Sequence, residues 1–261
     1  MADAIVRGGV KLHYQRLGLE GAPVRVVFLH GLVMDNLASW YFSVANAVAG
    51  AADVLLYDLR GHGLSDRPEG GYTLGDMVGD LESLTAQIFG DHPVVLVGNS
   101  FGALLAVSFA LRLPRRTAGL VLVDGHLGDD GFAERMTATL SLRGDDADRQ
   151  IAESFKHWLG RHSERKRTRL AEHARALVMD TSLVRDLRAT PPLGPEDFAR
   201  IEAPTLALYG EKSDLIAQSR PLVARIPRAT FEMIPGCTHS IIWEATAAVR
   251  ARIVAFCEER A

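Results

Sequence analysis

The five residues Gly98-Asn99-Ser100-Phe101-Gly102 place a serine between two glycines in the pattern G-x-S-x-G. An apolar run at 94–97 precedes them and a helical pattern at 100–112 follows. A strand that turns sharply into a helix exposes the serine at its tip, and the glycines leave room for neighbouring backbone. The helix N-terminus adds partial positive charge, which favours an oxyanion. The pattern therefore predicts Ser100 as a nucleophile.

A serine hydroxyl with its ordinary pKa is a weak nucleophile and needs a general base. His239 lies in a loop between the apolar run at 230–234 and the helical pattern at 240–259. Loops held by a rigid sheet are common sites of catalytic groups. We therefore predict His239 to be the base that activates Ser100.

A carboxylate should orient that histidine and stabilise its charged form. Residues 98–102 resemble the nucleophile turn of the α/β-hydrolase superfamily, and this resemblance implies the chain order serine, acid, histidine. Asp214, after the apolar run at 205–209, fits this order and is the predicted acid. Glu211 is a competitor that lies closer to the strand end. Asp124, at the end of the run at 120–123, is the main alternative, and it could instead cap its loop.

Two backbone N–H groups should bind the oxyanion of a tetrahedral intermediate. Phe101 directly follows the nucleophile, and Leu32 lies in the loop 30–36, where Gly31 lets the chain turn close to the site. We predict the N–H groups of Leu32 and Phe101 as the two donors. We expect His30 to brace this loop by hydrogen bonds.

Large side chains could enclose an apolar pocket around these groups. Met34, Trp158 and Trp243 are the predicted pocket residues, although Trp243, like Trp40, could instead fill the core. A pocket with few charges would favour a neutral acyl substrate.

Apolar runs alternate with helical patterns along most of the chain, which predicts an α/β fold with a mostly parallel twisted sheet flanked by helices. Residues 127–200 interrupt this alternation with about four helical patterns and no convincing strand, and they end in the breaker cluster at 191–195. We therefore predict a core formed by 1–126 and 201–261 and a helical cap formed by 127–200.

The composition is that of an ordinary globular protein. The 261 residues are 48% hydrophobic, and the net charge of −3 gives no reason to expect nucleic acid or an anionic membrane as a partner. A small-molecule acyl substrate is the expected partner, and the chain should be a monomer or a homodimer. The sequence indicates no cofactor and no metal site, because no cluster has the spacing of metal ligands.

The expected compartment is the cytoplasm. The N-terminal residues do not read as a secretory signal, and no apolar run is long enough to span a membrane. The two cysteines, Cys237 and Cys257, do not form a disulfide framework and are expected to be small buried thiols.

Together these motifs resemble the α/β-hydrolase superfamily over nearly the whole chain. His30-Gly31 resembles its oxyanion loop, and residues 58–68 resemble its D-x-R-G-x-G-x-S-x-x-P segment. Residues 210–214 and 236–239 resemble its acid and base loops. The resemblance implies an α/β-hydrolase fold whose cap covers the active site and shapes the substrate pocket.

Two narrower resemblances point in different directions. Asn99-Ser100-Phe101 resembles the nucleophile turn of meta-cleavage-product hydrolases, which cleave carbon–carbon bonds. Those enzymes usually have a Gly- and Pro-rich oxyanion loop and a tryptophan after the catalytic histidine, whereas this chain has Leu32 to Asn36 and Ser240. Residues 32–43 and 239–244 resemble stand-alone hydrolases and thioesterases of polyketide pathways.

We therefore predict a serine hydrolase, an esterase or thioesterase, that cleaves a carboxylic ester or thioester through an acyl-enzyme. A carbon–carbon bond hydrolase is one alternative, and a non-catalytic ligand-binding protein on a hydrolase fold is another. The basic run at 161–169 could contact an acidic acyl carrier protein, or it could be a solvated helix face.

Overall fold

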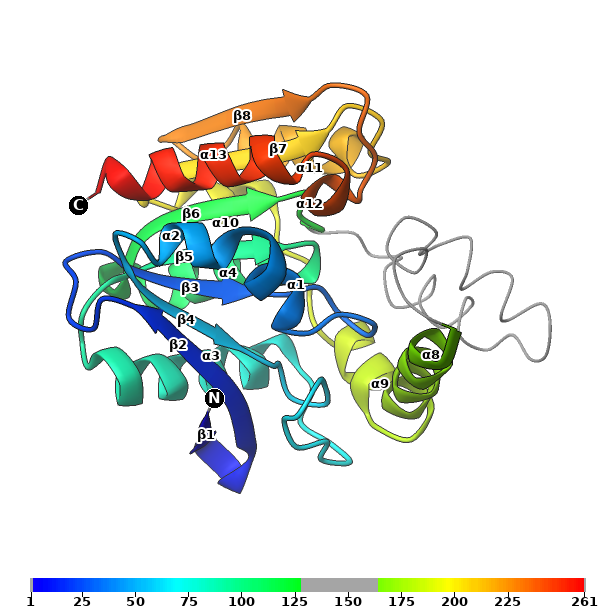
Figure 1. The fold of residues 1–261 in the computed structure, drawn as a ribbon. Helices are drawn as coiled ribbons and strands as arrows, with labels where there is room; N and C mark the ends of the chain where they lie inside the picture. The colour runs from blue at the N-terminus through cyan, green and yellow to red at the C-terminus, as the bar shows by residue number, and fades with distance from the viewer. Residues whose placement is uncertain (1, 128–163, 261) are drawn as a thin grey trace.

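The computed structural model describes residues 2–127 and 164–260, and for 164–169 and 171 it describes the backbone alone. Its centre is an eight-stranded sheet in the order β1-β2-β4-β3-β5-β6-β7-β8 (Figure 1). β1 and β2 are antiparallel to their neighbours, and β3 to β8 pair in parallel. The strands are β1 (Ala2–Ile5), β2 (Lys11–Gly18), β3 (Arg25–Leu29), β4 (Asp53–Tyr57), β5 (Val94–Asn99), β6 (Thr117–Val123), β7 (Thr205–Gly210) and β8 (Ala229–Ile234).

The central strands are buried on both faces, as their continuous apolar runs predict. In β3, Val27 and Leu29 belong to one hydrophobic cluster, while Val26 and Phe28 belong to the cluster on the opposite face. The predicted α/β class with a mostly parallel sheet is thereby confirmed.

Helices cover both faces of the sheet (Figure 1). One face carries α3 (Leu74–Phe89) and α4 (Phe101–Arg112); the other carries α1 (Ala38–Trp40), the π-helical turn η2 (Tyr41–Ala45), α2 (Asn46–Val48), α12 (Ile241–Glu244) and α13 (Thr246–Glu258). α11 (Ile216–Val223) follows β7. The single helix predicted over 240–259 is wrong, because the backbone leaves the helical region at Ala245 (φ −133°, ψ 43°) and separates α12 from α13.

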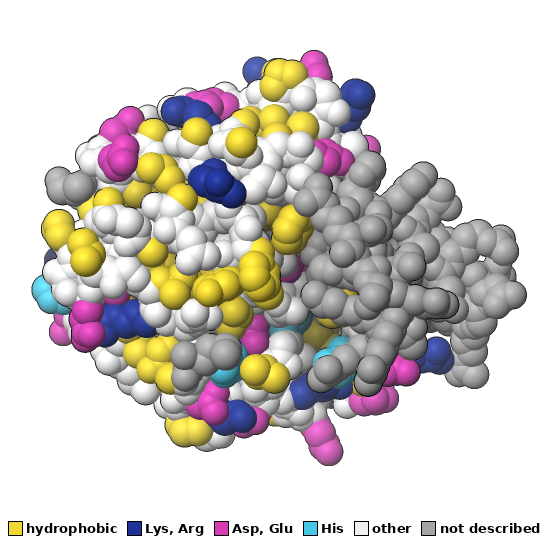
Figure 2. Space-filling model, in the orientation of Figure 1, with side chains coloured by type: hydrophobic (Ala, Val, Ile, Leu, Met, Phe, Trp, Pro, Cys, Tyr) yellow, Lys and Arg dark blue, Asp and Glu magenta, His cyan; other side chains and the backbone are white. Residues whose placement is uncertain are grey.

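Part of the surface over α1 and α2 is apolar. Figure 2 shows hydrophobic side chains gathered over these elements, where Phe42 is 76% exposed. The ring of Phe42 lies edge-on to that of Tyr41, with centroids 5.0 Å apart. The two rings therefore cover one another in part while remaining at the surface.

Within 127–200, the described residues form α8 (Glu164–Met179), α9 (Leu183–Arg188) and α10 (Pro195–Ala199), and they include no strand. The start of α9 is tied to the loop that precedes α3. The Tyr72 N–H donates to Asp186 Oδ2 at 2.9 Å, and the Ser182 N–H donates to the Glu69 carbonyl at 2.8 Å. These bonds fix the start of α9 against the loop between β4 and α3.

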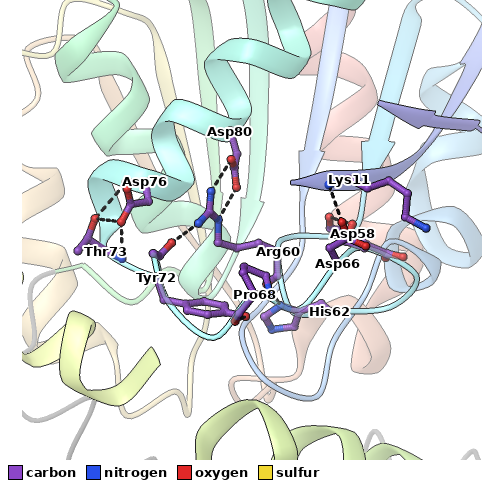
Figure 3. Close-up of polar contacts among 12 residues, drawn as sticks. Lys11, Asp58, Arg60, His62, Asp66, Pro68, Tyr72, Thr73, Asp76 and Asp80 are labelled. Carbon is purple, nitrogen blue, oxygen red and sulfur yellow. Dashed lines mark hydrogen bonds and ion pairs between the residues drawn. The ribbon is translucent and has the colours of Figure 1, made fainter. Parts of the chain in front are cut away.

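That loop is itself fixed by a buried ion pair (Figure 3). Arg60 donates through Nε and Nη2 to the two oxygens of Asp80, each at 2.6 Å, and a third nitrogen donates to the Gly71 carbonyl. Both side chains of the pair are buried. Such a forked contact is favourable only when both partners are present, because either charge alone would be desolvated without compensation.

We predict that Arg60→Met destabilises the fold by about 3–5 kcal/mol, because it leaves the Asp80 carboxylate buried and unpaired. The double variant Arg60→Met/Asp80→Leu should recover much of this loss, since no charge then remains. Urea denaturation followed by circular dichroism measures both free energies of unfolding. If the free energy of unfolding of Arg60→Met lay within about 1 kcal/mol of that of the natural chain, the Arg60–Asp80 pair would not be a buried ion pair that stabilises the fold.

Candidate active site

Ser100 lies between β5 and α4 in a strained backbone conformation. Its φ of +52° and ψ of −116° place a non-glycine residue in a region that L-residues rarely occupy. Its N–H donates to the Val123 carbonyl at 3.0 Å, and its carbonyl accepts the N–H groups of Ala103 and His126. Hydrogen bonds to the end of β6, to the residues just after it and to α4 therefore hold the turn in place. The predicted strand–serine–helix geometry is confirmed.

The flanking glycines are required by close backbone contact. A Cβ atom at Gly98 would lie 2.2 Å from the Gly102 carbonyl oxygen, and one at Gly102 would lie 2.3 Å from the Leu29 carbonyl oxygen. Either side chain would force the turn open. This is the physical content of the G-x-S-x-G pattern in this chain.

His239 lies in the loop between β8 and α12, and its Nδ1 is 2.9 Å from Asp124 Oδ1. Because an ionised carboxylate only accepts, Nδ1 carries the proton and leaves Nε2 available as a base. The Asp124 side chain is fully buried, and the His239 side chain is 47% exposed. The arrangement combines a fixed imidazole with access to the pocket.

Asp124 is the carboxylate that the structure brings to the histidine. It follows β6 with a φ of +44°, and its own N–H donates to the Leu208 carbonyl. Its oxygens also accept the Gly210 N–H at 2.7 Å and the Ser213 hydroxyl. These donors hold its carboxylate in one orientation.

The prediction that Asp214 binds the distal imidazole nitrogen is wrong. Asp214 is exposed, and the carboxylate bonded to Nδ1 of His239 is that of Asp124. The end of β7 and the loop after it instead supply donors to Asp124: the backbone N–H of Gly210 and the hydroxyl of Ser213. Two adjacent parallel strands end at the same place, so an aspartate after either one could reach the histidine.

A pocket lined by Ser100 lies at the carboxyl edge of the sheet. Its lining includes Gly31, Leu32, Met34, Asp35, Asn99, Ser100, His239, Ser240, Ile242 and Trp243. The structure thus brings Ser100 and His239 to one pocket. Met34 and Trp243 line it as predicted, whereas Trp158 lies outside the described residues.

The side chains of the two predicted oxyanion donors differ in burial. Leu32 lines the pocket, whereas the Phe101 side chain is buried in the core and its backbone opens α4. Their donation to an oxyanion remains a prediction. Asp35 and Ser213 are not among the residues predicted from the sequence. A carboxylate within the oxyanion loop is the signal that points to Asp35.

Two buried imidazoles brace the loop that carries Leu32. His30 donates from Nδ1 to the Gly31 carbonyl at 2.6 Å and accepts the Leu59 N–H at Nε2, so its expected bracing role is confirmed. His62 accepts the Val33 N–H at 2.8 Å and bonds the Arg60 carbonyl through Nδ1. Figure 3 shows His62 beside Arg60 in the loop after β4.

His62 is neutral in the folded protein. Burial, together with the nearby His30 ring at 5.1 Å, lowers the pKa of His62 to about 3. Both of its nitrogens are engaged with backbone, and a protonated ring could not accept the Val33 N–H. The loop 30–36 is thus held by a ring that cannot be charged without losing its contact with the Val33 N–H.

Other reactive side chains contribute little to this site. Burial raises the pKa of the Cys237 thiol and raises that of Cys257 to about 12, which makes both weak nucleophiles.

Within 2–127 and 164–260, no group of three or more His, Cys, Asp or Glu side chains could hold a metal ion. None of the helices in these ranges combines the length and hydropathy of a membrane span.

Comparison with known proteins points to one family. A model of the alpha/beta hydrolase family matches residues 26–252. A proline iminopeptidase of Saccharolobus solfataricus is 31% identical over 119 residues, which cover 45% of this chain and 38% of the peptidase. The first curated relatives are matched over about half of their own length or less.

Longer matches are weaker in identity. A 2-hydroxy-6-oxononadienedioate/2-hydroxy-6-oxononatrienedioate hydrolase 2 of Pseudomonas putida is 27% identical, and the match covers 90% of this chain and 87% of the relative. The solved enol-lactonase of Burkholderia xenovorans has a TM-score of 0.77 at 24% identity and covers 98% of this chain and 99% of its own. At this identity the structural likeness shows the fold alone.

We predict that His62 makes the fold less stable in acid. The unfolded chain takes up a proton at this histidine below about pH 6.5, while the folded chain does not until about pH 3. Stability should therefore be complete above about pH 6.5 and fall by roughly 1.4 kcal/mol for each pH unit below it.

Urea denaturation at several pH values between about 7.5 and 4.5 tests this expectation in the natural chain and in His62→Gln. The variant should be less stable at neutral pH but should lose less stability on acidification. Parallel pH profiles for the two proteins would show that the His62 ring does not remain neutral.

Proposed function

Because this chain is an enzyme of the alpha/beta hydrolase family, we propose that it cleaves a carboxylic ester or thioester through an acyl-enzyme on Ser100. One observation carries the proposal: Ser100, on a strained turn at a helix start, shares a pocket with a histidine whose Nδ1 is bonded to a buried carboxylate. This combination suits nucleophilic catalysis by a hydroxyl.

The proposed reaction begins when Ser100 Oγ attacks the scissile carbonyl carbon and its proton passes to His239 Nε2. Asp124 keeps the Nδ1–H oriented and stabilises the imidazolium. The N–H groups of Leu32 and Phe101 bind the oxyanion. His239 then protonates the departing alkoxide or thiolate.

Water completes the cycle by the same route. It loses a proton to His239 as it attacks the acyl-enzyme, and the collapse of the second tetrahedral intermediate returns that proton to Ser100 Oγ. The products are a carboxylic acid and an alcohol or thiol. Each step uses one base and one oxyanion site.

A carbon–carbon bond hydrolase is the second candidate. The long match to the Pseudomonas putida relative and the turn Asn99-Ser100-Phe101 favour it. Two features favour the ester hypothesis instead: the loop from Leu32 to Asn36 and Ser240 after the histidine. Parallel assays with an ester and a vinylogous diketone would separate the two.

We propose a small-molecule acyl compound as the substrate and the cytoplasm as the compartment. The two buried free thiols, Cys237 and Cys257, suit a reducing environment. We also propose an acyl carrier protein as a partner. This proposal rests on the basic run at 161–169, whose side chains lie outside those described.

We predict that Ser100→Ala lowers turnover of p-nitrophenyl acyl esters by at least about a thousandfold and abolishes labelling by a fluorophosphonate. Ser108→Ala is the matched control, because Ser108 lies on the same helix and bonds the Leu104 carbonyl. Full turnover by the Ser100 variant, with the control unchanged, would remove Ser100 as the nucleophile and with it the proposed acyl-enzyme.

We predict that Asp124→Asn lowers kcat by about 10³–10⁴-fold, because the amide no longer stabilises the imidazolium and can hold the wrong tautomer. Asp214→Asn should change kcat by less than about threefold, since its side chain is exposed and not bonded to His239. The opposite ranking in steady-state kinetics would return the acid to position 214.

A further inference from the structure

Asp35 places a carboxylate in the pocket that holds Ser100. Its Oδ2 accepts the Gly31 N–H at 2.8 Å, and its Oδ1 accepts the Asn36 N–H at 2.9 Å and the Ser39 hydroxyl. A carboxylate that accepts from three donors and gives up no proton is satisfied in its ionised form. The oxyanion loop therefore holds a negative charge at the pocket wall.

This charge lies close to the nucleophile. A methyl group placed on Gly31 would lie 3.2 Å from Asp35 Oδ2 and 3.6 Å from both Ser100 Cβ and Asn99 Nδ2. The carboxylate, the amide and the nucleophile thus surround one point of the oxyanion loop. Asp35 is partly exposed, so its charge acts on whatever occupies the pocket.

The partners of Asp35 in the described part of the chain are all neutral donors. Neutral hydrogen bonds orient a carboxylate but do not cancel its charge. Asp124, by contrast, gains a cationic partner whenever His239 accepts a proton. The compensating charge for Asp35 can therefore come from the substrate.

We propose that Asp35 determines the substrate class: it excludes acyl groups that carry a carboxylate and favours those that carry an ammonium or another hydrogen-bond donor near the scissile carbonyl. The inference rests on the proposed acyl-enzyme, whose acyl group occupies this pocket. A unit charge at such short range changes affinity by about tenfold or more, even when water partly screens it.

The hydrogen bonds of Asp35 also shape the loop, so a substitution can slow every substrate alike. The informative quantity is therefore the ratio of kcat/KM between substrates of different charge, which a purely structural role would not move. Three p-nitrophenyl esters of matched length provide it: the butyrate is neutral, the hemisuccinate is anionic and the 3-aminopropanoate is cationic.

The natural chain should prefer the cationic ester over the anionic one by at least about tenfold, and Asp35→Asn should reduce this ratio by about tenfold. Asp66→Asn is the matched control: Asp66 lies in the loop after β4, its carboxylate accepts the Lys11 N–H of β2, and it lies outside the pocket lining. It should leave the ratio unchanged. Equal ratios in the natural chain and in Asp35→Asn, with butyrate still hydrolysed, would overturn this inference alone.

A second measurement needs no variant. Raising the KCl concentration from about 50 mM to about 500 mM should shrink the charge preference of the natural chain, because salt screens the carboxylate. A preference that does not change with salt would count against Asp35 as its source. Absence of both Ser100-dependent butyrate hydrolysis and fluorophosphonate labelling would instead overturn the proposed function, and the inference with it.

Discussion

The close contact between the Ser100 turn and its neighbouring strands is the constraint on which the site depends. Gly102 has no room for a side chain against the Leu29 carbonyl, and the Ser100 N–H is bonded to the Val123 carbonyl. β5 is thereby fixed between β3 and β6, and the loops after these three strands begin at one edge of the sheet (Figure 1). Surrounding contacts of this kind are what let a strained serine persist.

Buried polar groups hold the loops above that edge in one geometry. His30 and His62 each bond backbone through both nitrogens, and Arg60 is satisfied by Asp80 and the Gly71 carbonyl. A buried polar group costs free energy when it loses a partner, so small displacements of these loops are penalised. Apolar packing alone would tolerate such shifts, and donors for a developing oxyanion must be placed within a few tenths of an ångström.

Ser100 and His239 could be predicted because each lies in a local pattern that fixes its place: a strand–turn–helix and a loop after the last strand. The acid could not be chosen this way. β6 and β7 are neighbours, with Val123 opposite Leu208, so the residues after both strands reach the same space. The choice depends on the left-handed backbone of Asp124 and on donors from the end of β7 and the loop after it, which the sequence around Asp124 does not encode.

The two carboxylates of the site differ in how their charge is compensated. In the proposed reaction, Asp124 is paired with the imidazolium that forms on His239, which would compensate its buried charge. Asp35 lies in the loop 30–36, where its negative charge would oppose the negative charge that develops on the substrate in the proposed reaction. This repulsion would raise the free energy of the proposed transition state, so the charge of Asp35 needs a compensating role. The hydrogen bonds of Asp35 to Gly31 and Ser39 shape the loop. A cationic group of the substrate next to Asp35 would offset the repulsion between its carboxylate and the oxyanion. In the proposed reaction, the side chain that shapes the loop 30–36 would therefore also select the sign of charge on the acyl group.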